Sequence, residues 1–390
     1  MLAKVLSFGV LGMEAYPVEV EVNVSTGLPA VTLVGLADTA IRESKERVKS
    51  AIKNSGFQWP AERITINLAP SHIKKEGSNF DLAIALGILA ATKQVDAQLV
   101  KEYIFLGELA LEGSLRPVRG ILPISLAILH AERKKIILPS DNGKEAALVS
   151  GIMIYPMKDL NEIIHSIHNP EILIPLQVDL PALFQTERHY PIDFSEVKGQ
   201  YFAKRALEIA VAGGHNILMI GPPGSGKTML AKRIPTIMPD LTLAEALEVT
   251  SLHSIAGELP PTQGVFGKRP FRNPHHTVSH IGLVGGGPIP KPGEISLAHH
   301  GVLFLDELPE FPRNCLETLR QPLEEGTIRI SRISKSLLFP ASFMLIAAMN
   351  PCPCGFLSDP RKACRCNPGK IVSYMGKISG PLLDRIDIHI

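Results

Sequence analysis

This 390-residue sequence lacks an excess of charge of either sign, because it contains 40 Lys and Arg residues and 38 Asp and Glu residues. The net charge of +2 excludes an overall basic field for nucleic acid, so any such contact must come from a local patch. No apolar run approaches the ~18 residues that a membrane helix needs. The first residues resemble a signal peptide only weakly, because Glu14 interrupts the apolar stretch. We therefore expect a cytoplasmic protein without a membrane partner.

Cysteine is scarce, and five residues in so long a chain argue against a framework of disulfides. Four of the five lie close together in the sequence: Cys352, Cys354, Cys364 and Cys366. Four thiolates in two close pairs suit tetrahedral Zn²⁺, and a closed set of four predicts a structural site. Two disulfides or free thiols are the alternatives, because C-x-C is less diagnostic than C-x-x-C. Cys315 lies in an apolar-periodic stretch, and we expect it to be buried.

The composition, with 45% hydrophobic and 20% charged residues, suits a globular protein of two or three domains. Strands and helices alternate over residues 1–167, which indicates one α/β domain. Its pattern includes a strand in which Val18, Val20, Val22 and Val24 occupy every second position. We expect further strands over 63–68 and 135–138, helices over 36–54, 80–92 and 124–132, and a hairpin formed by 103–109 and 113–117. Recurrent prolines in residues 168–192 predict an extended, fairly stiff linker before a second domain over 193–390.

A glycine-rich loop dominates the second domain and fits the pattern G-x-x-x-x-G-K-[ST] at every fixed position. Its members are Gly221, Pro222, Pro223, Gly224, Ser225, Gly226, Lys227 and Thr228. The apolar run 217–220 predicts a strand before the loop, and 229–234 predicts the start of a helix after it. Glycines let backbone N–H groups converge on phosphate oxygens, and the helix directs its positive end at the same anion. We therefore expect Lys227 to reach the β- and γ-phosphates of ATP and Thr228 to help hold Mg²⁺.

Two further apolar runs end in polar residues, as a catalytic edge of a parallel sheet requires. The run 302–305 leads into Asp306 and Glu307, and the run 343–349 leads into Asn350. We expect Asp306 to bind Mg²⁺ through water and Glu307 to orient or activate the attacking water. For Asn350 the alternative is a strand-end turn with Pro351, because Asn commonly makes such turns.

These stretches resemble the Walker A, Walker B and sensor 1 motifs of AAA+ ATPases, and the resemblance implies that Asn350 contacts the γ-phosphate or the water. Residues 193–200, just before an expected helix over 201–212, resemble the opening box that flanks adenine in AAA+ proteins. Residues 380–387 resemble the Leu-Leu-Asp-Arg-Phe/Ile-Asp segment of magnesium chelatases and their relatives. This implies that Arg385 is an arginine finger for a neighbouring subunit. A surface arginine paired with Asp384 or Asp387 is the alternative.

The first domain resembles a Lon-protease-like domain, an α+β fold of the ribosomal S5 domain 2-like kind. The matching stretches are 75–83, 106–109, 113–120 and 136–139. Lon peptidases use a Ser–Lys pair in which the lysine activates the hydroxyl. The nucleophile position here carries Asn79 and the lysine position carries Leu122, although Ser78 and Lys74 or Lys75 are nearby. We therefore expect the fold without peptidase activity.

Two stretches separate the second domain from a generic AAA+ module. Residues 273–277 and 285–293 resemble an inserted loop that can project into the central pore of a ring. Histidines at 275, 276, 280, 299 and 300 give no tidy ligand set, and we interpret them as structural or loop residues. Residues 326–339 predict a β-hairpin on which Arg329, Arg332 and Lys335 are candidates for contact with DNA phosphates. A solvated hairpin with ordinary surface charges is nearly as good an interpretation.

Taken together, these motifs resemble the ComM/YifB family of magnesium-chelatase-like AAA+ proteins over nearly the whole chain. The resemblance implies an ATP-driven homo-hexameric ring and, in ComM-type members, a DNA helicase for branch migration during competence and recombination. Chelatase-like protein remodelling is the main alternative, although no D-x-S-x-S metal-adhesion motif is present. A Lon-like peptidase is the third. A complete module also carries a helical lid, which we expect to be absent from these residues, and we expect weak nucleotide binding and poor assembly as a result.

Overall fold

The computed structural model describes the chain except for residues 37, 76, 187, 189, 261–262, 288–289, 332–335, 358 and 361. It divides into two compact units, residues 1–184 with 253–265, and residues 185–252 with 266–390. The first unit thus continues past residue 167, where we expected its domain to end, and includes a short segment from within the second. Among the described residues, no helix has both the length and the apolar character needed to cross a membrane.

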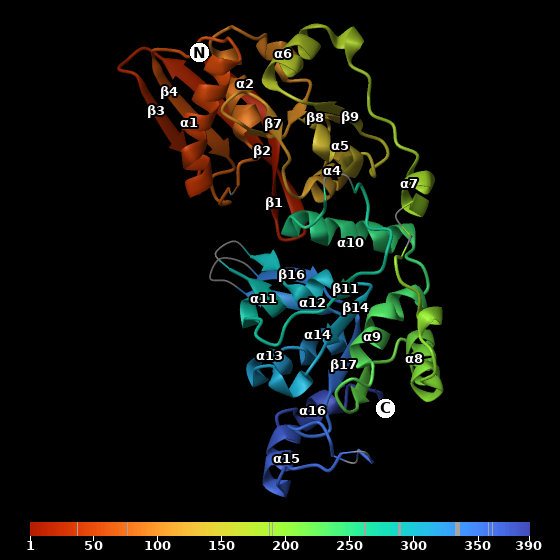
Figure 1. Cartoon of the computed structure of the whole chain (residues 1–390). Helices are drawn as coiled ribbons and strands as arrows, with labels where there is room; N and C mark the ends of the chain where they lie inside the picture. The colour runs from red at the N-terminus through yellow and green to blue at the C-terminus, as the bar shows by residue number, and fades with distance from the viewer. Residues whose placement is uncertain are drawn as a thin grey trace. The chain divides into compact units, whose positions relative to one another are not determined.

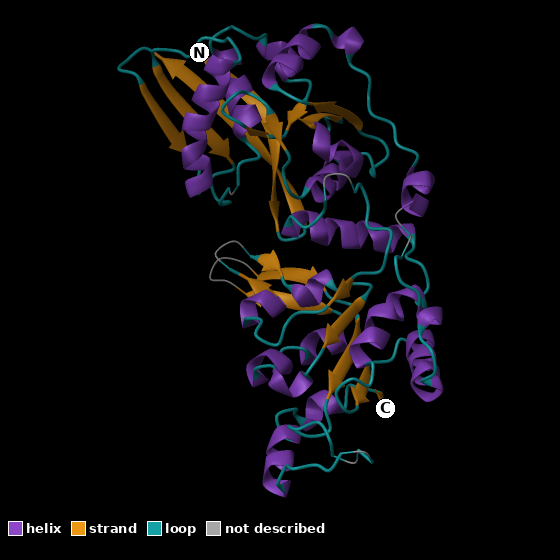
Figure 2. Ribbon diagram, in the orientation of Figure 1, coloured by secondary structure: helices purple, strands orange, loops and turns teal. Residues whose placement is uncertain are grey.

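The first unit is built on a seven-stranded mixed sheet in the order β3-β4-β2-β1-β5-β8-β9. Antiparallel pairs join β1 to β2 and β2 to β4, and the other neighbours are parallel. Figure 2 shows these strands in orange. The bounds are β1 (Leu2–Leu11), β2 (Glu14–Ser25), β3 (Ala30–Val34), β4 (Arg63–Ala69), β5 (Ile104–Phe105), β8 (Lys135–Pro139) and β9 (Met153–Met157).

Alternation along β2 follows the expected pattern. The side chains of Val18, Val20 and Val22 are completely buried, whereas Glu19 and Glu21 lie on the other face, beside Lys4 of β1. The buried valines join a core formed with α1 (Thr39–Asn54) and α2 (Asp81–Ala91). A second core covers the opposite face of the neighbouring strands β5 and β8, with α4 (Ile121–Leu129). The alternation therefore identifies the core face of the sheet, as the sequence predicts.

The expected hairpin forms only in part. β6 (Glu108–Leu109) pairs with β7 (Leu115–Arg116), whereas Ile104–Phe105 belong to the main sheet as β5, between β1 and β8. Both β5 residues are buried, one in each core, so this short segment is a central strand. The other helices of this part of the chain are α3 (Ala97–Val100), α5 (Gly143–Ala146), α6 (Leu160–His168) and α7 (Leu180–Thr186). α7 lies in the segment expected to be extended, and Pro181 fits because proline is tolerated in a first helical turn.

The second unit is built on a five-stranded parallel sheet in the order β11-β14-β17-β10-β18. Its strands are β10 (Ile217–Ile220), β11 (Phe271–Arg272), β14 (Val302–Leu305), β17 (Met344–Met349) and β18 (Ile388–His389). Helices α8 (Tyr201–Gly213) and α9 (Lys227–Arg233) bury residues against one face of this sheet (Figure 1). An all-parallel sheet places the carboxyl ends of its strands at one edge, where ligands bind in open α/β folds.

The remaining elements of the second unit surround this sheet. The helices are α10 (Leu243–Ala256), whose last turn belongs to the first unit, α11 (His280–Val284), α12 (Glu294–Leu297), α13 (Arg313–Glu317), α14 (Arg320–Glu325), α15 (Pro368–Met375) and α16 (Gly380–Leu383). Two hairpins complete it: β12 (Gly285–Gly286) with β13 (Lys291–Pro292), and β15 (Thr327–Ser331) with β16 (Ser336–Pro340). The second is the hairpin expected after residue 326.

Candidate nucleotide site

The candidate site lies where three neighbouring parallel strands of the second unit end. In the register of the sheet, Ile220 of β10 pairs with Met349 of β17, and Leu305 of β14 pairs with Ala347 two residues earlier. The residues that follow these strands are therefore brought to one edge, although they come from three distant parts of the sequence. The cavity at this edge has a volume of about 340 Å³. Its lining residues are Pro223, Gly224, Ser225, Gly226, Lys227, Thr228, Met229, Asp306, Glu307, Met349 and Asn350.

The phosphate loop occupies one wall of the cavity. Gly224 and Gly226 have φ angles of 78° and 89°, a left-handed conformation that glycine adopts without the steric cost of a side chain. The loop leads directly into α9, which begins at Lys227. Backbone N–H groups of the loop and of the first helical turn can therefore converge on an anion, and the fold supplies the strand–loop–helix context that the motif requires.

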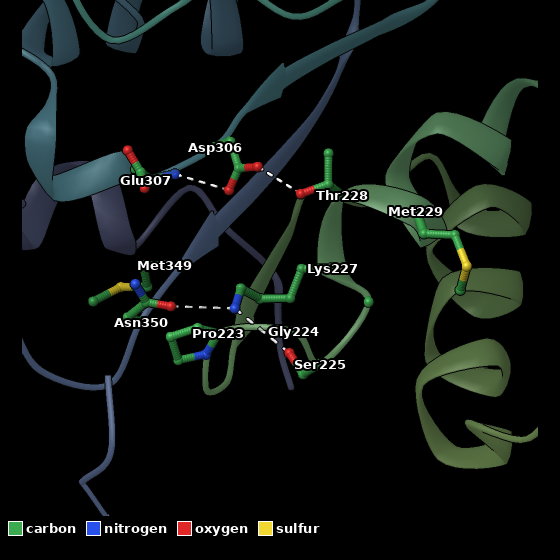
Figure 3. Close-up of a pocket in the computed structure, with 11 residues that line it drawn as sticks. Pro223, Gly224, Ser225, Lys227, Thr228, Met229, Asp306, Glu307, Met349 and Asn350 are labelled. Atoms are coloured by element: carbon green, nitrogen blue, oxygen red, sulfur yellow. Dashed lines mark hydrogen bonds between the residues drawn. The ribbon is translucent and has the colours of Figure 1, made fainter. Parts of the chain in front are cut away.

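Lys227 is held at this cavity by acceptors that follow two neighbouring strands, β10 and β17. Its Nζ atom donates to the backbone oxygens of Gly221 at 2.7 Å and Pro222 at 3.1 Å, and to Oδ1 of Asn350 at 3.3 Å. Figure 3 shows Lys227 and Asn350 pointing toward one another. Burial lowers the pKa of Lys227, since desolvation disfavours the charged amine. An incoming polyphosphate would offset that desolvation by direct charge pairing.

Thr228 and Asp306 form the second direct link between the loop and the sheet. The Thr228 hydroxyl donates to Oδ2 of Asp306 over 2.6 Å. Oδ1 of the same carboxylate accepts the backbone N–H of Glu307 at 3.0 Å. The two residues expected to hold Mg²⁺ therefore lie in contact, and hydroxyl and carboxylate oxygens are the donors that this hard cation prefers.

Glu307 lines the cavity beside Asp306 but has a different environment. Its backbone has φ 53° and ψ 46°, the left-handed conformation that is uncommon for residues other than glycine. Figure 3 shows Glu307 on the far side of Asp306 from Thr228. Its Oε2 atom lies 3.3 Å from Nδ1 of His276, in the segment that follows β11. Reasoning from sequence missed this contact, because the histidines between the two Walker motifs gave no recognisable pattern.

Arg385 belongs to the second unit but does not line this cavity. It directly follows Asp384, the cap of α16, and its guanidinium pairs with Glu324 of α14 and donates to the backbone oxygen of Pro381. The ion pair expected under the alternative interpretation, with Asp384 or Asp387, is replaced by this pair with Glu324. Asp387 instead accepts the backbone N–H of Asn216 at 2.9 Å. The function of Arg385 toward a neighbouring subunit stays a prediction.

The four clustered cysteines come together after β17. The Sγ atom of Cys352 lies 3.4 Å from that of Cys354 and 3.6 Å from that of Cys364, and Cys366 completes a group of four sulfur atoms within 4.8 Å of one another. Tetrahedral Zn–S bonds of about 2.3 Å place sulfur atoms roughly 3.8 Å apart, so this donor set fits a Zn²⁺ ion. Backbone N–H groups lower the pKa of Cys354 to about 6, whereas the neighbouring sulfur atoms raise the pKa values of Cys364 and Cys366. Thiols this close together disfavour several thiolates at once, and a bound cation would offset that repulsion.

A second group of potential ligands consists of Glu248, His299 and His300. Nε2 of His299 lies 3.0 Å from Oε2 of Glu248, and Nε2 of His300 lies 2.9 Å from the same oxygen. Nδ1 of His299, however, accepts the backbone N–H of Ser342 at 3.0 Å. A neutral imidazole that accepts at Nδ1 must carry its proton on Nε2, so His299 donates to Glu248 and has no lone pair there for a metal. These residues are therefore structural partners.

Of the candidate DNA contacts, the structure describes only Arg329, whereas Arg332 and Lys335 lie outside the described residues. Arg329 and Ser331 occupy the exposed face of β15, and Ile328 and Ile330 are buried on the other. Side chains therefore alternate between an exposed and a buried face along β15, and Arg329 lies on the exposed face.

Asn79 and Leu122, the residues expected at the positions of the Lon dyad, make structural contacts in the first unit. The Asn79 amide donates to the backbone oxygen of Phe8 at 2.7 Å, and the side chain of Leu122 is completely buried. Nearby, the Ser78 hydroxyl donates to the carboxylate of Glu108, and the buried Lys75 amine donates to the backbone oxygen of Pro70. An amide bonded to the backbone and an aliphatic side chain cannot form a nucleophile and its base.

Comparison with known proteins extends these local matches to the whole chain. A family described as "Magnesium chelatase, subunit ChlI" matches residues 193–390, and one described as "Subunit ChlI of Mg-chelatase" matches residues 20–142. Competence protein ComM of Haemophilus influenzae is 46% identical over 391 residues, which cover 100% of this chain and 76% of that protein.

A protein named YifB from Escherichia coli is 46% identical over 381 residues, covering 97% of this chain and 74% of that protein. Lon protease 2 of Bacillus subtilis is 29% identical over 157 residues, covering 37% of this chain and 27% of that protein. The matches to ComM and YifB extend over both units, whereas the Lon match covers only part of the chain. The chain therefore belongs to the ComM/YifB family of magnesium-chelatase-like proteins.

Proposed function

We propose that this chain is an ATP-hydrolysing AAA+ motor of a DNA-processing ring. The observation that carries the proposal is the convergence of Lys227, Thr228, Asp306, Glu307 and Asn350 on one cavity at the carboxyl edge of a parallel sheet. Each residue type has a task in phosphoryl transfer, and a meeting of all five at one edge is not expected by chance.

The residues divide the work of hydrolysis by their chemistry. Lys227 balances the charge of the β- and γ-phosphates, and Asn350, which already contacts Lys227, orients the γ-phosphate or the water. Thr228 and Asp306 would hold Mg²⁺, which would neutralise charge on the phosphate oxygens. Glu307 accepts a proton from the attacking water, a task for a carboxylate that lines the cavity without being bonded to the loop.

A homo-hexameric ring completes the site in this proposal. Arg385 would enter the cavity of a neighbouring subunit, where its planar guanidinium offsets the charge that develops on the transferred phosphoryl group. Contact with single-stranded or branched DNA would come from the exposed face of β15, which carries Arg329. The relative in Haemophilus influenzae is named a competence protein, which supports a role of this chain in competence. The proposed activity is branch migration on that DNA during transformation and recombination.

The four-cysteine group would hold structural Zn²⁺ in this proposal, with no open position for catalysis. The group directly follows Asn350, so the metal would fix the segment after the catalytic edge. The first unit would act without peptidase activity. Its Leu122 and Asn79 are committed to the core and to a backbone hydrogen bond, which supports this part of the proposal.

The test is the steady-state rate of ATP hydrolysis by a version of the protein that includes the helical lid, with and without single-stranded and forked DNA, measured beside Glu307→Gln. We expect hydrolysis that DNA stimulates and that Glu307→Gln abolishes. Glu208→Gln is the matched control, because Glu208 is an exposed residue of α8 that forms a surface ion pair with Arg205. Hydrolysis that depends on Glu307 but is indifferent to DNA would favour a protein remodeller. Absence of hydrolysis, or full activity in Glu307→Gln, would overturn the proposed chemistry.

A further inference from the structure

We infer that His276 is a positioning residue that orients the Glu307 carboxylate for activation of water. This inference rests on the proposed ATPase function and assigns a task to a residue outside the recognised motifs. The observation behind it is the 3.3 Å separation between Nδ1 of His276 and Oε2 of Glu307. The two atoms lie at ion-pair distance for a protonated ring, and the ring as placed does not form a hydrogen bond with the carboxylate. A small rotation of either side chain would align an Nδ1–H group with Oε2 for donation.

The carboxylate needs such a contact because little else restrains it. The side chain of Glu307 is 54% exposed, and a long exposed side chain distributes itself among several rotamers. A general base must hold its oxygen within hydrogen-bond reach of the water in one geometry. A donor that binds Oε2 fixes the plane of the carboxylate and leaves Oε1 free to accept the proton of a water in the cavity.

The ring of His276 is itself held in place. The ring of His275 lies against it at a tilt of 33°, with ring centroids 4.1 Å apart, and Phe311 meets it edge-on with centroids 6.4 Å apart. Phe311 is almost fully buried, so it forms a fixed wall. Nδ1 of His275 in turn lies 2.9 Å from the Thr277 hydroxyl. A short chain of contacts therefore runs through the segment after β11 to the carboxylate, and it gives His276 the rigidity that a positioning residue needs.

The backbone of Glu307 adds to the same constraint. Its left-handed conformation, with φ 53° and ψ 46°, is sterically unfavourable for a residue with a side chain and persists only where the surroundings determine it. This conformation sends the side chain of Glu307 away from Thr228, which Asp306 contacts, and toward His276. Two neighbouring carboxylates thus take separate partners, one in the phosphate loop and one in the segment after β11.

The experiment compares kcat and KM for ATP in the full chain and in three variants at saturating Mg²⁺. We expect His276→Ala to lower kcat about tenfold with KM nearly unchanged, a smaller loss than the roughly 10²–10⁴-fold contribution of a general base. His276→Asn keeps a donor near the position of Nδ1 and should recover part of kcat. The control His280→Ala removes an exposed histidine of α11, four residues along the chain, and should leave both parameters unchanged.

A double variant separates positioning from general damage. If His276 acts only through Glu307, then His276→Ala combined with Glu307→Gln should be no slower than Glu307→Gln alone. Wild-type kcat in His276→Ala, while Glu307→Gln is inactive, would overturn this inference and leave the proposed function standing. A rise in KM equal to the fall in kcat, without recovery in His276→Asn, would show a structural role instead. Wild-type activity in Glu307→Gln would overturn the proposed function itself.

Discussion

Substitution of Arg385 separates a surface ion pair from an arginine finger, because the two roles predict effects of very different size. Within one chain, the Arg385 guanidinium pairs with Glu324, and the side chains are 23% exposed for Arg385 and 55% exposed for Glu324. Ion pairs that are this exposed to solvent contribute about 1 kcal/mol or less to the free energy of unfolding. Arg385→Ala should therefore lower the melting temperature of a unit of this size by at most about 2–4 °C.

The catalytic effect should be far larger. A guanidinium that offsets charge on the transferred phosphoryl group contributes roughly 10³–10⁵ in kcat, or about 4–7 kcal/mol. Glu324→Gln is the matched control, because it removes the same ion pair and leaves the guanidinium in place. We expect it to reproduce the small change in melting temperature while retaining ATP hydrolysis.

The assay measures thermal unfolding and kcat per subunit for both variants, over a range of protein concentration. A finger that acts in a neighbouring subunit should also inhibit in mixtures, since each Arg385→Ala subunit disables the site beside it. The reasoning is refuted if Arg385→Ala hydrolyses ATP at the wild-type rate in assembled protein. It is also refuted if Arg385→Ala and Glu324→Gln lose activity equally, because the ion pair alone would then account for the effect.

The other predictions concern the expected Mg²⁺ ligand Thr228, the close packing just before β14 and the cysteine group. Thr228→Val removes the hydroxyl that bonds to Asp306 and should lower kcat at least 10²-fold, whereas Thr228→Ser should retain most activity in a Mg²⁺ titration. Gly301→Ala would place a Cβ atom 2.1 Å from the backbone oxygen of Pro270, so it should destabilise the protein by about 1–3 kcal/mol or more in urea unfolding. Cys352→Ala should reduce bound zinc, measured by elemental analysis, and lower the melting temperature; equal zinc content in both proteins would contradict the assigned ligand set.

Much of the fold follows from periodicity and from turn residues. The alternating valines of β2 identify both the strand and its buried face, and residues 217–228 predict the strand, loop and helix that the structure contains. These segments are predictable because a local hydrophobic pattern indicates both the type of element and which of its faces is buried. The sheet edge follows as well, since polar residues after buried parallel strands must meet on one side.

Other features depend on contacts between distant segments. β5 has two residues and no alternation to detect, and only its place between β1 and β8 makes it a strand of the main sheet. β18 is equally short and is defined by pairing with β10, more than 160 residues earlier. Residues 253–265 carry no composition change that would assign them to the first unit. In each case tertiary pairing determines the structure and local propensity does not.

The same distinction applies to the candidate site. Lys227, Thr228, Asp306 and Asn350 follow recognisable elements, so their types and positions suffice to predict that they meet. His276 lies in a loop, and its side chain reaches Glu307 only because the segment after β11 passes beside the end of β14, its neighbour in the sheet. Sequence can indicate which residue performs the chemistry, because that residue must end a strand. The residue that orients it can come from any segment that passes within reach, and only the folded arrangement identifies it.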